Sequence, residues 1–177
     1  MIAPDGRPIV LGLHVCSQGF GWAAFADPFT VYKHGVYRAP ADRKSSACLK
    51  KAKWLLGRIN PEILVLEAFD EQSGRAQWIR DLCIEIVGVA AEQGVEITVF
   101  RRGEIQEAFR VLKARTREDI AEAVARQAPA LAPYLPKRRQ AWDGEDRRQS
   151  RFCAAALVLT HYHFEAHEFF EDLRKAA

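Results

Sequence analysis

The sequence predicts a mixed α/β fold with a five-stranded sheet, three antiparallel strands followed by two parallel ones, flanked by helices. The N-terminal segment consists of short apolar runs separated by tight turns, which is typical of antiparallel hairpins. Two later apolar runs each follow a helical pattern, and such crossovers produce parallel strands. The run EILVLEAF is almost wholly apolar, as expected for a strand covered on both faces.

The first three strands are predicted from turn residues. In residues 9–25, IVLGLHVCSQGFGWAAF, two apolar runs flank a Ser-Gln-Gly-Phe turn, which is the pattern of a β-hairpin. A third run follows the turn at Asp27-Pro28. We therefore expect strands over residues 8–15, 21–26 and 30–37.

Helical periodicity and stop signals divide the rest of the chain. Asn60-Pro61 ends the first predicted helix and Gly94 ends the second. The motif TRED places Thr116 as the N-cap of a later helix with a capping box. The Pro-rich, basic segment 129–146 is expected to be a surface loop. The predicted helices cover residues 42–59, 75–93, 103–112, 116–128 and 145–174, and the last two strands cover 62–69 and 95–100.

Composition favours one globular domain spanning residues 1–177, since 49% of the residues are hydrophobic and 28% are charged. The net charge of +3 permits a polyanionic partner without requiring one. Four cysteines without a CxxC pair are expected to be reduced thiols. The start MIAPDGRP lacks a secretory pattern, and no apolar run approaches the roughly 20 residues that span a bilayer. We expect a cytoplasmic protein without a membrane partner.

Several segments, in chain order, resemble the RuvC-type Holliday junction resolvases, a family with the ribonuclease H-like fold. Residues 9–25 resemble the opening strand pair of the family, and PEILVLEAF resembles its fourth strand, which ends in a catalytic glutamate. LCIEIVGVAAEQGVEITVF resembles the helix and strand that follow, and KARTREDIAEAVARQAPAL and WDGEDRRQSRFCAAALVLTHY resemble the C-terminal half. The resemblance implies a ribonuclease H-like fold and a structure-selective endodeoxyribonuclease.

The resemblance also implies a metal centre. Two-metal nucleases hold two divalent ions about 3.5–4 Å apart with clustered carboxylates. Mg²⁺ or Mn²⁺ is therefore the expected cofactor, with Glu67 as metal ligand and catalytic residue unless it only faces water at a strand end. The resemblance further points to Asp146, with Glu145 beside it, at the start of the last helix. Alternatively, these two carboxylates complement the helix dipole.

Two positions depart from the family pattern. His14 stands where the family has a first-strand aspartate, and Cys153 stands where the last helix usually carries another. If the helix begins at Glu145, Asp146 and Cys153 lie two turns apart on one face. His14 has three interpretations: a ligand to a softer ion such as Mn²⁺ or Zn²⁺, a general base, or the remnant of a lost nuclease centre.

Basic residues gather in two segments, where they are expected to neutralise phosphates unless they only form a solvated surface. Phe69, next to Glu67, is expected to wedge into a DNA junction or to pack in the core. The basic candidates for nucleic-acid binding are Arg101, Arg102, Lys113, Arg115, Arg117, Lys137, Arg138 and Arg139.

Three functions stay open from the sequence: a metal-dependent nuclease acting on branched DNA, an inactive nucleic-acid-binding protein on the same scaffold, and an interaction protein without a nucleic-acid role. Resolvases act as dimers because a junction has two strands to cut symmetrically. The resemblance therefore implies a homodimer. Its seam is expected on the helix at residues 75–93, through Trp78, Ile79, Leu82 and Ile86, unless these side chains belong to the core.

Overall fold

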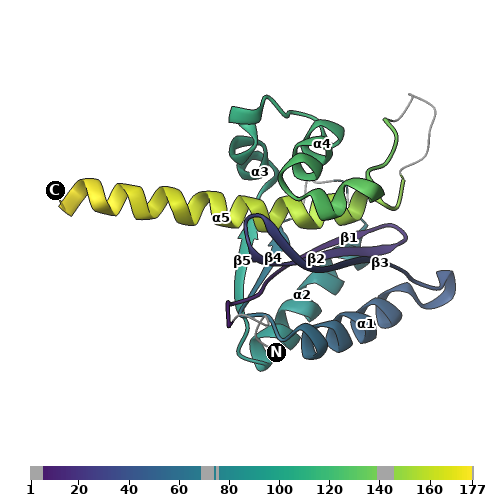
Figure 1. Ribbon diagram of the computed structural model, residues 1–177. Helices are drawn as coiled ribbons and strands as arrows, with labels where there is room; N and C mark the ends of the chain where they lie inside the picture. The colour runs from purple at the N-terminus through teal and green to yellow at the C-terminus, as the bar shows by residue number, and fades with distance from the viewer. Residues whose placement is uncertain (1–5, 69–73, 75, 139–145, 177) are drawn as a thin grey trace.

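The computed structural model describes residues 6–68, 74, 76–138 and 146–176. A five-stranded sheet with the strand order β3-β2-β1-β4-β5 lies between two layers of helices (Figure 1). The strands are β1 (Val10–Cys16), β2 (Gly19–Asp27), β3 (Thr30–Arg38), β4 (Ile63–Glu67) and β5 (Glu96–Phe100).

The pairing of the strands confirms the predicted sheet. β1 pairs with β2 and β2 with β3 in antiparallel orientation. β4 lies parallel to β1, with Gly12 opposite Val65, and β5 lies parallel to β4. β1 and β4, which are separated by a whole crossover in the sequence, are thus neighbours at the centre of the sheet.

Five α-helices over the described residues cover the two faces. α1 and α2 pack on one face, and α5 lies across the other with α3 and α4 beyond it (Figure 1). Thr116 caps α4 as predicted: its hydroxyl accepts the N–H of Asp119, whose carboxylate accepts the N–H of Thr116. The helices are α1 (Lys44–Ile59), α2 (Gln77–Glu92), α3 (Arg102–Ala108), α4 (Arg117–Gln127) and α5 (Gln149–Ala176).

Three predicted boundaries were wrong. The helix expected over 103–112 ends at Ala108 and is followed by a separate 3₁₀ turn, η2 (Arg110–Leu112), which ends at Lys113, where the backbone is left-handed with φ of 56°. Part of the expected loop is a 3₁₀ helix, η3 (Pro129–Tyr134), anchored by the buried Leu131. The last helix begins at Gln149 rather than at Glu145.

The late start of α5 has a local cause. The carboxylate of Asp146 accepts the backbone N–H of Arg148 at 2.9 Å, and its carbonyl accepts the N–H of Gln149 at 2.8 Å. An aspartate that bonds the backbone two residues ahead forms a turn that competes with helix. Asp146 therefore lies before the helix, and the prediction that it shares a helical face with Cys153 was wrong.

Two apolar layers sandwich the sheet. Alternate residues of β1 face opposite sides, so Leu11 and Leu13 pack with α1 and α2 while Val10 packs with α5. None of the helices over the described residues has the length and apolar character needed to cross a membrane.

α5 approaches the sheet backbone directly. A Cβ added at Gly12 of β1 would overlap the carbonyl oxygen of Ala154, and one added at Gly21 of β2 would overlap the backbone at Ser150. Glycine at these two positions removes the side chain that would otherwise hold the helix away from the strands. The first turns of α5 therefore lie against β1 and β2.

We predict that Gly12→Ala destabilises the protein by about 1–3 kcal/mol, because backbone atoms of α5 would have to shift to admit the methyl group. Gly57→Ala is the matched control. A Cβ at Gly57 of α1 meets nothing within 4 Å, and alanine there should stabilise the helix by about 0.5–1 kcal/mol. Urea unfolding measures the free energy of unfolding of both variants. Equal stability of the Gly12→Ala variant and the parent would contradict the close approach of α5 to β1.

Candidate functional site

The candidate site lies where β1 and β4 end beneath α5. By strand alternation His14 and Glu67 both point to the α5 face, the same face as Val10 and Val65. The Nδ1 atom of His14 lies 3.2 Å from the Oε2 atom of Glu67. Because β1 and β4 are neighbouring parallel strands, two residues far apart in sequence meet at one edge.

This pair is buried, since the side chains of His14 and Glu67 are only 2% and 7% exposed. A carboxylate removed from water is costly unless a hydrogen-bonding or charged partner compensates it. The imidazole at contact distance is such a partner. His14 is therefore one of the groups that accompany Glu67 in its buried position at the end of β4.

α5 and the neighbouring helices close a narrow cavity over Glu67. Cys153 and Gln149, one helical turn apart on α5, line it together with Glu67. Arg102, the first residue of α3, and Arg117, the first residue of α4, line the same cavity. The Gln149 side-chain amide donates a hydrogen bond to the Arg117 carbonyl at 3.0 Å, which ties α5 to the start of α4.

The described side chains at this site do not fit a two-metal centre. Glu67 is the one carboxylate among the described residues that line the cavity; beside it lie the Cys153 thiol and two guanidinium groups. Over the described part of the chain, no three His, Cys, Asp or Glu side chains gather where they could hold a metal ion. Mg²⁺ prefers several oxygen ligands, and two arginines repel a cation.

Asp146 belongs to a neighbouring pocket rather than to the cavity over Glu67. That pocket is also lined by Arg117, Gln149, Lys137 and Arg138. Arg148 binds Asp146 through several hydrogen bonds, including one of 2.7 Å from Nη2, and these bonds lower the pKa of the Asp146 carboxyl. Arg148 thus already compensates the charge of Asp146.

Comparisons with known proteins were made for sequence and structure. No family model matches the sequence, and no curated protein matches it. The structure is similar to Thermus thermophilus RuvC in complex with a Holliday junction substrate, with a TM-score of 0.66 and 16% identity over 91% of this chain and 96% of that chain. A second T. thermophilus RuvC structure is also similar, with a TM-score of 0.66 and 14% identity over 90% of this chain and 96% of that chain.

The chain has a RuvC-like, ribonuclease H-like fold. The Fowlpox virus resolvase in complex with Holliday junction DNA is also similar, with a TM-score of 0.53 and 13% identity over 86% of this chain and 99% of that chain. At such low identity these similarities establish the fold alone, which confirms the fold expected from the sequence.

Within this RuvC-like fold, the structure brings together only some of the predicted site residues. His14, Glu67, Cys153, Arg102 and Arg117 gather under α5, and Lys137 and Arg138 line the adjoining pocket. Arg101, Lys113 and Arg115 are exposed. Glu145, Phe69 and Arg139 lie outside the described residues.

Sequence reasoning missed Gln149. The residue lies four positions before Cys153, so the two share one face of α5. A correctly placed helix start would have identified it, because the i, i+4 spacing then selects Gln149 rather than Asp146 as the partner of Cys153.

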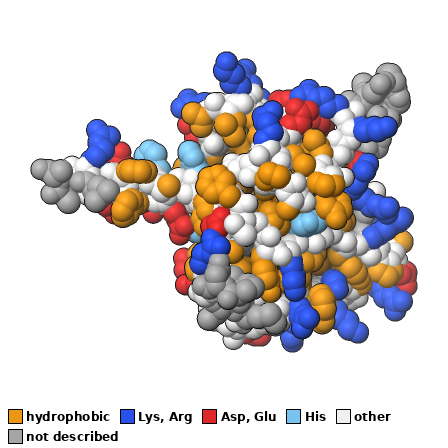
Figure 2. Space-filling model, in the orientation of Figure 1, with side chains coloured by type: hydrophobic (Ala, Val, Ile, Leu, Met, Phe, Trp, Pro, Cys, Tyr) orange, Lys and Arg blue, Asp and Glu red, His pale blue; other side chains and the backbone are white. Residues whose placement is uncertain are grey.

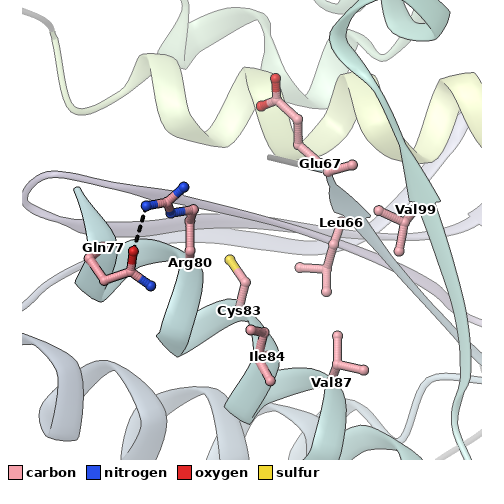
Figure 3. Close-up of a pocket in the computed structure, with 9 residues that line it drawn as sticks. Leu66, Glu67, Gln77, Arg80, Cys83, Ile84, Val87 and Val99 are labelled. Atoms are coloured by element: carbon pink, nitrogen blue, oxygen red, sulfur yellow. Dashed lines mark hydrogen bonds between the residues drawn. The ribbon is translucent and has the colours of Figure 1, made fainter. Parts of the chain in front are cut away.

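A wider apolar groove runs along the opposite side of β4, between α2 and β5. Leu66, Val99, Ile84 and Val87 form its walls, and Glu67 stands at its end with the carboxylate turned toward α5 (Figure 3). The groove therefore reaches Glu67 from the face of the sheet that α1 and α2 cover.

We predict that His14→Asp combined with Cys153→Asp lowers stability by several kcal/mol in the absence of metal, because buried carboxylates beside Glu67 repel one another. Added Mg²⁺ should then stabilise the variant, by about 2.7 kcal/mol at a hundredfold excess over its Kd, whereas the parent should not respond. Thermal unfolding with and without Mg²⁺ measures both effects.

The neutral double variant His14→Asn with Cys153→Ser is the matched control and should show no Mg²⁺ response. Tight Mg²⁺ binding by the parent would refute the conclusion that the present side chains do not fit the metal.

Proposed function

We propose that this protein binds branched DNA on a RuvC-like scaffold, at a site where arginine side chains supply the positive charge that metal ions supply in a two-metal nuclease. The observation that supports this proposal most directly is the presence of Arg102 and Arg117 beside Glu67 under α5. Guanidinium groups form charge-assisted hydrogen bonds with phosphate oxygens.

The similar structures support the choice of ligand. The T. thermophilus RuvC and Fowlpox virus resolvase structures are each complexes with Holliday junction DNA. The RuvC-like fold extends over nearly the whole of this chain, so the strands β1 and β4 and the helices around their ends have counterparts in that fold.

Basic residues around the site favour a polyanion. Lys113 and Arg115 are exposed on the segment between α3 and α4, and Lys137 lines the pocket next to Arg117. Arg138 is a weaker candidate, because Glu122 and Asp119 bind it at 2.7 Å and 2.9 Å and raise its pKa. A phosphate would have to compete with these two carboxylates.

We predict that the protein binds four-way junction DNA equally well in EDTA and in Mg²⁺, and that binding weakens steeply with salt. Charge reversal at Arg102 and Arg117 should weaken binding and reduce the slope of log K against log salt by about 2. Fluorescence anisotropy over a salt series measures both quantities.

Arg58→Glu is the control, since Arg58 is exposed on α1 at the other face of the sheet. Unchanged affinity after charge reversal at Arg102 and Arg117, or a strict metal requirement for binding, would contradict the proposed role of these arginines.

A second candidate function is a metal-dependent nuclease requiring Mg²⁺ or Mn²⁺. The buried Glu67 favours it, because a desolvated carboxylate paired with a histidine at a strand end is a common mark of a catalytic site. Junction cleavage by the parent in Mn²⁺, lost in Glu67→Gln, would establish this function in place of pure binding.

We further propose that two copies act together on a junction. The burial of Ile79, Leu82 and Ile86, with Trp78 packed against the same cluster, supports the alternative that these side chains belong to the core. The outward face of α2 instead carries Ile84, 70% exposed, and β5 adds Val99, 47% exposed. A twofold contact through this face would suit the twofold symmetry of a junction.

We predict that Ile84→Arg weakens this dimer without unfolding the protein, because the side chain is exposed and lines only the groove. Sedimentation velocity should show a shift toward smaller species. Ile86→Arg is not an equivalent test, since Ile86 is fully buried. An unchanged association constant in Ile84→Arg would exclude α2 as the seam.

A further inference from the structure

The C-terminal part of α5 leaves the body of the protein. α5 runs over 28 residues, Gln149–Ala176, and its distal half projects beyond the sheet and the other helices (Figure 1). Residues 165–170 are all exposed, and Phe169 and Phe170 are 62% and 64% exposed. Figure 2 shows hydrophobic side chains on this projecting arm.

An apolar stripe continues from the body into the arm. Leu159, Tyr162, Ala166 and Phe169 follow one another at spacings of three, four and three residues. This spacing is typical of a seam along which one helix packs against another. Within the body the stripe has partners, but beyond residue 165 the described part of the chain offers it no contact surface.

The inner half of the stripe lines an apolar groove. Leu159, Tyr162 and His163 form one wall, and η2 forms the opposite rim. On that rim Val111 is 79% exposed and Leu112 is 49% exposed. The groove and the two phenylalanines are thus two exposed apolar surfaces along one helix.

These two surfaces cannot meet within one chain. Phe169 and Phe170 lie seven residues beyond Tyr162 and His163, which is about 10 Å along a continuous helix. The charges are complementary: Lys113 and Arg115 follow the rim, whereas the arm carries Glu165, Glu168, Glu171 and Asp172. This acidic character also disfavours nucleic acid as the partner of the arm itself.

We propose that the arm of α5 packs antiparallel against the arm of a second copy of this chain, crossing at Ala166. In this register Phe170 lies opposite the partner's Tyr162 and Phe169 opposite the partner's His163, so each arm fills the other copy's groove. The small side chain of Ala166 permits close approach at the crossing point. The contact differs from the α2 seam and does not depend on DNA binding.

Folding of the arm supports a partner. A helical segment of about 12 residues is marginal by itself in water, and most helix stability comes from packing of an apolar face. A second arm would supply that packing on the side where Phe169 and Phe170 are exposed.

The test uses the full chain with Ile84→Arg, which removes the α2 contact, so that any remaining self-association reports the arm. We expect this variant to form smaller species than the parent, which can use both contacts, but still to dimerise through the arm in sedimentation equilibrium. Adding Phe169→Glu and Phe170→Glu should raise the dimer dissociation constant at least about tenfold, because each buried aromatic contributes strongly to association. Both residues are exposed, so the fold should persist by circular dichroism.

Lys175→Glu is the matched control. This substitution changes the net charge by the same amount as the two phenylalanine substitutions together. Lys175 is nine residues from Ala166 and therefore lies on the opposite side of the helix, so the substitution should leave the dimer intact. Ala166→Cys should form a disulfide between two copies under mild oxidation, whereas Glu168→Cys on the outer face should not.

A monomeric Ile84→Arg variant at high micromolar concentration would overturn the proposal. Self-association that survives the two phenylalanine changes would also overturn it. Absence of the Ala166→Cys cross-link in a sample that dimerises would refute the antiparallel register.

Discussion

The contact of α5 with the bare backbone of β1 and β2 is the constraint on which the rest of the structure depends. Gly12 and Gly21 leave no side chain between helix and sheet, so the first turns of α5 lie directly over the strand ends. This places Cys153 and Gln149 above Glu67 and fixes the direction in which the helix leaves the body. The site and the projecting arm are two ends of one rigid element.

Over the described residues, the charges that line the site differ from those of a carboxylate cluster that holds two metal ions. Such a cluster is negative until its cations bind. Here Glu67 lies beside the imidazole of His14, and Arg102 and Arg117 bring positive charge on the starts of two helices. Among the described residues, this arrangement of charges suits an anion, which supports the proposed binding of phosphate.

The sheet and most of the helices could be predicted from the sequence, because apolar periodicity, Thr116 and turn residues act locally. The start of α5 could not, since the hydrogen bonds of Asp146 to the next residues outweigh the helical pattern around them. Because of that error, Asp146 was expected beside Cys153. In the structure, Gln149 lies beside Cys153 at the candidate site. Arg102 and Arg117 were predicted only as two of a larger set of nucleic-acid-binding candidates, because tertiary packing decides which basic residues line the cavity over Glu67.

The distribution of surface chemistry separates the proposed roles in space. Arginine and lysine residues surround the ends of β1 and β4, whereas acidic residues and phenylalanines occupy the arm about four helical turns further along α5. An acidic arm next to the cationic site would compete with phosphates for Arg102 and Arg117, and a basic arm would attract DNA away from that site. Separation along one helix lets a single chain carry a surface for a polyanion and a surface for its own copy, although Lys113 and Arg115, next to the groove, contribute positive charge to both.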